Sequence, residues 1–140
     1  MSEPKQTAIT VVRPEDLSTS TAQTAGSQRW AAFDAATGVS GLWAGSFEVQ
    51  PGASTGIHHH GEQETVVYVL EGEALVRWGE RGEHHATVRA GDFLHVPSWL
   101  IHQEVNPSPT LPFRWIVVRS SAMPVVVDLP DSQWPIVHPE

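Results

Sequence analysis

Short stretches in which apolar and polar residues alternate recur along most of this 140-residue chain. Alternation with a period of two is typical of β-strands that bury one face. Glycine and proline separate the stretches at short intervals, as expected for turns between strands. The pattern predicts eight or nine short strands, within residues 8–12, 41–49, 65–72, 73–79, 85–90, 92–97, 102–105, 113–120 and 124–129.

Helical periodicity is weak by comparison. The best helical segment is a single turn near Pro14, and residues 19–27 are polar enough to form a surface loop. Many short strands with turn signals between them indicate an all-β fold, either a sandwich or a closed barrel. At this length we expect one domain with a core of its own.

The amino-acid composition limits the kinds of metal site and binding partner that this chain can have. The chain has no cysteine, which excludes disulfides and thiolate metal sites. Its formal net charge of −8, with scattered basic residues, argues against nucleic acid or an anionic membrane as a partner and favours small molecules. The N-terminus has no apolar signal region, and no segment approaches the length of a membrane span. We therefore expect a cytoplasmic protein.

The stretch from Gly52 to Gly72 carries the first candidate site. It contains three consecutive histidines, and His58 and His60 are two apart, so an extended chain projects both to the same face. Two imidazoles on one face form half of a metal site. A solvent-exposed histidine cluster is the alternative interpretation.

A second stretch, Ala90 to Asn106, supplies a third histidine. With it, the chain resembles the cupin superfamily, whose two motifs run in order along the sequence. The first motif matches Gly52, His58, His60, Glu64 and Gly72, and the second matches Gly91, Pro97, His102 and Asn106. The second motif departs from the family pattern only at its inner glycine, which is Trp99 here.

This resemblance implies a single-domain jelly-roll β-barrel over residues 29–128, with an N-terminal strand or loop extension over 1–28 and a proline-rich tail over 129–140. It implies one divalent transition metal inside the barrel, bound by His58, His60 and His102 and by a fourth ligand from the first motif. Imidazole and oxygen donors suit zinc, iron, manganese, nickel, cobalt or copper. It also implies a homodimer, in which the segment at 8–12 pairs with a partner subunit.

The fourth ligand has several candidates. Glu64 stands at a normal cupin interval after His60, but the interval counted back from Gly72 falls on Thr65. In an unbroken strand Gln63 shares the face of Thr65, whereas Glu64 points to the other face unless the strand has a bulge. Gln63 and Glu64 are therefore the two leading candidates, and water is the alternative to both. His59, between the two ligand histidines, faces away from the metal.

Further residues have candidate roles around this site. His95 lies two residues before Pro97 and is the candidate general acid or base, although a structural histidine is the alternative. Trp99 immediately precedes the turn into His102, and we expect it to form a wall of the substrate pocket. Arginines on predicted strands are expected at the surface, but one that points inward would bind a substrate carboxylate or phosphate, with Arg77, Arg114 and Arg119 as candidates.

Four protein ligands leave positions open on the metal, which is the arrangement of a catalytic centre. We expect a metal-dependent enzyme acting on a small organic molecule, with the metal as a Lewis acid in an isomerase or cyclase or as the dioxygen-binding centre of a dioxygenase. The sequence resembles small bacterial single-domain cupins, including polyketide cyclases. A non-catalytic metal-containing binding or sensor protein is the alternative.

Overall fold

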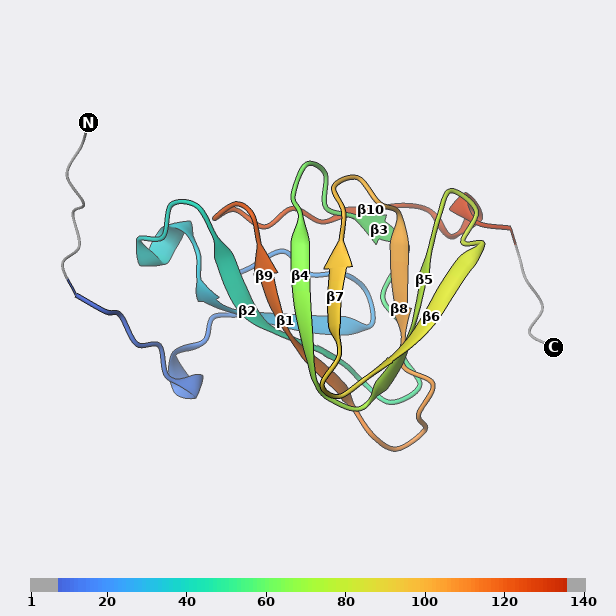
Figure 1. The fold of residues 1–140 in the computed structure, drawn as a ribbon, viewed down its shortest axis with the longest axis horizontal. Coiled ribbons are helices and arrows are strands. Elements are labelled where there is room, and N and C mark those ends of the chain that lie inside the picture. The colour runs from blue at the N-terminus through green and yellow to red at the C-terminus, as the bar shows by residue number, and fades with distance from the viewer. Residues whose placement is uncertain (1–7, 136–140) are drawn as a thin grey trace.

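The computed structural model describes residues 8–135, which form an all-β domain (Figure 1). Three single 3-10 turns, η1 (Pro14–Asp16), η2 (Ala35–Thr37) and η3 (Asp131–Gln133), accompany the strands. The strands are β1 (Ser27–Phe33), β2 (Trp43–Val49), β3 (His58–His59), β4 (Thr65–Glu71), β5 (Glu73–Trp78), β6 (His84–Arg89), β7 (Phe93–Val96), β8 (His102–Val105), β9 (Phe113–Arg119) and β10 (Val127–Asp128).

Two antiparallel five-stranded sheets make up the domain. The first has the strand order β1-β2-β9-β4-β7 and the second has the order β10-β3-β8-β5-β6. The chain passes between the sheets repeatedly, as in a jelly roll, and strands distant in sequence such as β2, β9 and β4 lie side by side (Figure 1). The all-β jelly-roll barrel predicted from the sequence is confirmed.

The alternation in the sequence explains which face each strand buries. Along β2 every second residue is buried, and the same holds for the inward face of β9. Phe47 of β2 stacks on Trp115 of β9 with ring centroids 5.1 Å apart, and Trp43 is fully buried beside them. These aromatic side chains belong to the hydrophobic core, and Phe47 and Trp115 also lie beside the polar residues of the interior.

Two segments differ from the sequence-based expectation. Residues 8–12 form no strand in this single chain, and Ile9 and Val11 are exposed. Conversely, β1 lies in a segment without a predicted strand. Its inward positions are Arg29 and Ala31 rather than large apolar residues, so the alternation that marks the other strands is absent.

The C-terminal segment from Ser120 to Pro135 crosses the ends of the strands as a strap and docks on the chain's own barrel (Figure 1). β10 pairs with β3, the Leu129 amide donates to Ile57, and the buried Trp134 indole donates to the Gly79 carbonyl at 3.0 Å. Residues 136–140 of the predicted tail lie outside the described part. Between residues 8 and 135, no helix is long and apolar enough to cross a membrane.

Candidate metal centre

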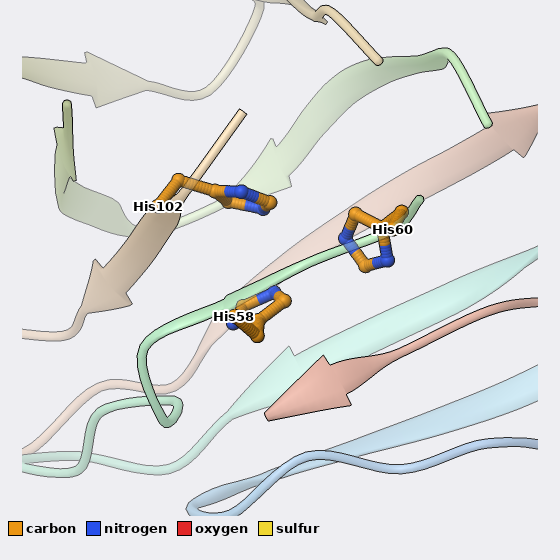
Figure 2. A group of neighbouring side chains, drawn as sticks. All are labelled: His58, His60 and His102. Carbon is orange, nitrogen blue, oxygen red and sulfur yellow. The ribbon is translucent and has the colours of Figure 1, made fainter. Parts of the chain in front are cut away.

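Three buried imidazoles converge inside the barrel (Figure 2). His58 is in the short strand β3, His60 follows directly after it, and His102 opens β8, where it pairs with His58 in register. One nitrogen from each ring lies within 4.8 Å of the other two, which is close enough for a single metal ion to bind all three. The structure therefore brings together the three histidines that the sequence singles out.

Each imidazole is oriented by a backbone carbonyl. The Nδ1 atoms of His58, His60 and His102 lie 2.7, 2.7 and 2.8 Å from the carbonyl oxygens of Gly56, Val125 and Leu100. Because a carbonyl oxygen only accepts hydrogen bonds, each Nδ1 carries the proton and donates it. A neutral ring that is protonated at Nδ1 presents an unprotonated Nε2 atom, which is the form that binds a metal.

Glu104 completes this cluster. It is two residues after His102 on β8, so its side chain points to the same interior face, and it is almost completely buried. Its two carboxylate oxygens lie 3.4 Å from Nε2 of His102 and 3.8 Å from Nε2 of His58. The Thr55 hydroxyl donates a hydrogen bond to the second of these oxygens at 2.9 Å and fixes the carboxylate.

Burial and neighbouring charges set the protonation of the cluster. Burial lowers the pKa of His58 to about 4, although Glu104 partly opposes the shift. Burial, followed by the charge of Arg119, lowers the pKa of His60 well below its ordinary value. Burial alone would raise the pKa of Glu104, but His102, His58 and Arg29 together hold it below its ordinary range. At neutral pH, His58 and His60 are therefore neutral and Glu104 is charged.

The opposite wall of the interior comes from the first sheet. Arg29 of β1 and Arg119 of β9 are 1% and 2% exposed, and with Thr65 of β4 they line a small polar cavity that also touches His60, His102 and Glu104. Burial, as the largest cause, lowers the pKa of Arg29 to about 10 and that of Arg119 to about 9, so both remain positively charged at neutral pH.

A larger, apolar cavity of about 410 Å³ lies on the other side of His102. Its wall is formed by side chains of β5 to β8 and the turn between β7 and β8, including Val76, Val88, Leu94 and Leu100. Val96 and His102 belong to the walls of both cavities. A small organic molecule bound in the apolar cavity would therefore contact His102.

The two predicted fourth ligands do not lie at the cluster. The Gln63 amide nitrogen donates to Ser121 and Met123 and its oxygen accepts from the Val125 amide, so the side chain anchors the strap. Glu64 is on the outer face of the first sheet, more than half exposed, where it binds His95. No bulge rotates Glu64 inward, and strand alternation therefore directs it away from the interior.

His95 and Trp99 lie away from the three histidines. The His95 ring binds Glu64 on the outer face, because Leu94 and Val96 take the inward positions of β7, but His95 also belongs to the wall of the apolar cavity. Trp99 is 61% exposed, packs against His59 with ring centroids 5.5 Å apart, and does not line the apolar cavity. It adopts a φ of 65°, a left-handed conformation that explains why the family motif has glycine at this position.

Sequence reasoning missed Glu104 and Arg29. The signal for Glu104 was present, because His102 and Glu104 are two apart on one predicted strand and must share a face. Arg29 had no such signal, since no strand was expected at its position. Arg119 was a candidate for an inward-pointing arginine, and the structure places it inside.

Comparisons with known proteins agree with this fold. Residues 45–119, more than half of the chain, match the model of the cupin domain family. No curated protein matches the chain.

Among solved structures, the polyketide cyclase RemF from Streptomyces resistomycificus superposes with a TM-score of 0.70 at 23% identity, over 91% of each chain. An oxalate oxidase reaches a TM-score of 0.66 at 25% identity, over 85% of this chain and 66% of its own. An oxalate decarboxylase from Lactobacillus farciminis reaches 0.69 at 21% identity over 82% of this chain, which spans about a third (34%) of the decarboxylase. At such identities the cyclase and the decarboxylase support the fold alone. The family match, the jelly-roll topology and the paired histidine motifs together establish that the chain belongs to the cupin family.

Proposed function

We propose that this cupin is a divalent-metal-dependent enzyme that acts on a small organic molecule, and that His58, His60, His102 and Glu104 hold the metal. The ligand set combines three neutral imidazoles with one carboxylate, which suits zinc, iron, manganese, nickel, cobalt or copper. Glu104 of the second motif thus replaces the first-motif ligand of the sequence-based prediction.

The main support for this proposal is that the neutral His58 directs an unprotonated Nε2 at the Glu104 carboxylate, so that two hydrogen-bond acceptors face each other. Nε2 of His58 is buried without a hydrogen-bond partner in the described residues, and Nε2 of His58 and His102 both face the Glu104 carboxylate. Lone pairs directed at an anion in a buried site repel one another and lack solvation. A bound cation would convert this repulsion into coordination, so the donor set fits a metal ion.

When bound, the metal would supply either a Lewis acid for a carbonyl or enolate oxygen, as in isomerases and cyclases, or a centre for dioxygen. The protein would supply the surroundings. Val76, Val88 and Leu94, which line the apolar cavity, would exclude water and hold the substrate body against His102. The three backbone carbonyls keep the imidazoles in the tautomer that the site requires.

Elemental analysis of wild type and alanine variants would test the metal site. His58→Ala, His60→Ala and His102→Ala should each lose the metal, because three ligands hold it too weakly and with the wrong geometry. The matched control is His84→Ala, which removes an exposed histidine on β6 and should leave metal content unchanged. Full metal content in any of the first three variants would refute the assignment.

A substrate screen would separate the classes of function. Aromatic and dicarbonyl compounds would be added to the metal-loaded protein in an oxygen electrode while products are followed by mass spectrometry. Oxygen uptake selects the dioxygenase, and an isomeric or cyclised product without oxygen uptake selects the Lewis-acid reaction. Ligand binding without turnover across the whole screen would overturn the enzymatic proposal in favour of a binding or sensor protein.

The proposal includes a homodimer and a cytoplasmic location, both expected from the sequence. Support for the dimer comes from apolar side chains exposed on the outer face of the first sheet, including Val66, Tyr68, Phe93 and Ile116. Such a patch marks an interaction surface. Light scattering should give a dimer for the wild type and a monomer for Phe93→Glu. A monomeric wild type would contradict this part of the proposal.

A further inference from the structure

Two arginines are buried inside the barrel without ion-pair partners. Arg29 and Arg119 are almost fully buried, and no carboxylate in residues 8–135 lies within 4.0 Å of either guanidinium. Their charges are balanced only in part at longer range, by Glu104 for both arginines and by Asp128 for Arg29. Aromatic rings also contribute: Arg29 lies 4.8 Å from the Phe47 centroid and Arg119 lies 5.3 Å from that of Trp43. Burying a cation without a partner costs free energy, so a bound anion that pairs with these arginines would stabilise the site.

Several donors of these arginines lack acceptors. Nε of Arg29 and both Nε and Nη1 of Arg119 are buried without a hydrogen-bond partner in the described chain, and so is the Thr65 hydroxyl. Arg29 has one weak bond, from Nη1 to the Ala22 carbonyl at 3.4 Å. Arg29, Arg119 and Thr65 line the same polar cavity beside His60 and His102, and these donors suit an acceptor group.

The size of this cavity limits its occupant. Its volume of about 10 Å³ is close to that of one water-sized group, so a whole organic molecule does not fit. A carboxylate oxygen has the right size and charge. The apolar cavity of about 410 Å³ shares Val96 and His102 with the polar cavity and could hold the rest of the molecule.

Charge points to the same class of ligand. A divalent metal would add two positive charges to the two guanidiniums, against the single buried negative charge of Glu104 and the exposed Asp128. The interior would then be strongly positive, and an anionic ligand would neutralise it far better than a neutral one.

We propose that Arg29 and Arg119 form the binding site for the carboxylate of an amphipathic organic acid, whose apolar body occupies the neighbouring cavity beside the metal. This inference rests on the proposed function, because it names the substrate class of the same site. The guanidiniums would receive the carboxylate as charge-assisted hydrogen-bond donors, and the Thr65 hydroxyl would supply a neutral donor.

Calorimetry with benzoate and its neutral analogue benzamide would test this site in both zinc-loaded and metal-free protein. Benzoate should bind the metal-free protein at least about tenfold more tightly than benzamide, because charge-assisted hydrogen bonds to the arginines remain without zinc. Equal affinity of the two compounds for the metal-free protein would overturn the proposal without requiring any variant.

Arg119→Met should weaken benzoate binding about tenfold or more and leave benzamide binding and zinc stoichiometry unchanged. The matched control, Arg114→Met, removes an exposed arginine of the same strand, which pairs with Glu71 outside the barrel. Unchanged benzoate affinity in a folded Arg119→Met protein would overturn the proposal.

If Arg119→Met fails to fold, Arg119→Lys keeps the charge but loses the planar fork, and benzoate affinity should still fall. Unchanged affinity in that variant would likewise overturn the proposal. Zinc stoichiometry, measured on the same samples, reports separately on the proposed metal function.

Discussion

At the residue scale, the chemistry of the site depends on Glu104. Its position follows from alternation along β8, which places His102 and Glu104 on one interior face. The Thr55 hydroxyl and the neighbouring imidazoles keep this carboxylate charged and directed at the histidines. Glu64, the carboxylate that family spacing favours, is instead bound to His95 on the outer surface.

Replacing these two glutamates by alanine should therefore give opposite results. Glu104→Ala should lower zinc affinity by about a hundredfold, because it removes the proposed ligand, whereas Glu64→Ala should have little effect. Competition with a chromophoric chelator measures both affinities. A strong loss of zinc affinity in Glu64→Ala, with normal zinc affinity in Glu104→Ala, would show that Glu64 is the fourth ligand, as the family motif predicts.

Trp99 has a backbone role rather than a role in the pocket. Its φ of 65° is tolerated by glycine and is most costly for β-branched residues. Trp99→Gly should keep both metal content and benzoate affinity, while Trp99→Val should destabilise the fold by about 1–2 kcal/mol. Chemical denaturation and calorimetry measure the two effects. Weaker benzoate binding by a stable Trp99→Gly protein would show that Trp99 does form part of the pocket wall.

At the element scale, the strap over residues 120–135 contacts the candidate metal centre. Val125 accepts the Nδ1 proton of His60, and Gln63 holds the strap in place through Ser121, Met123 and Val125. Gln63 is thus a positioning residue that acts on His60 through the strap.

Gln63→Ala should loosen this strap and weaken zinc binding by about tenfold, less than the loss of a ligand. Hydrogen exchange should become faster at residues 121–127, because the Val125 amide loses its acceptor. Gln50→Ala, which removes an exposed glutamine, is the control. Unchanged exchange and unchanged zinc affinity would show that the strap does not position His60.

The sequence predicted most elements because alternation marks them. It predicted the histidine triad because His58 and His60 are two residues apart and because the resemblance to the two cupin motifs adds His102. It failed where a buried polar residue interrupted the alternation, as at Arg29 in β1. The orientation of Gln63 could not be predicted either, because its partners are about 60 residues later in the chain and the strap follows no periodic pattern.

At the scale of the whole molecule, the buried histidines link stability to pH. The pKa of His58 is about 4 in the folded protein, below its ordinary value of 6.5, so the unfolded chain binds more protons between these pH values. The free energy of unfolding of metal-free protein should therefore fall as pH decreases from about 6.5 to 4, by on the order of 3 kcal/mol from His58 alone.

Urea denaturation of the metal-free protein across this pH range measures the effect. His58→Gln should show a shallower dependence on pH, because it removes one of the groups that titrate. Metal-free stability that stays constant or rises as pH falls towards 4 would contradict the burial of neutral imidazoles.

The proposed site holds one metal ion between His58, His60, His102 and Glu104. A crystal structure of the zinc-loaded protein, with anomalous diffraction collected at the zinc edge, tests it most directly. We expect a single strong peak bonded to the three Nε2 atoms and to a carboxylate oxygen of Glu104. A peak bonded to Gln63 or Glu64 instead of Glu104, or the absence of a peak among the three histidines, would contradict it.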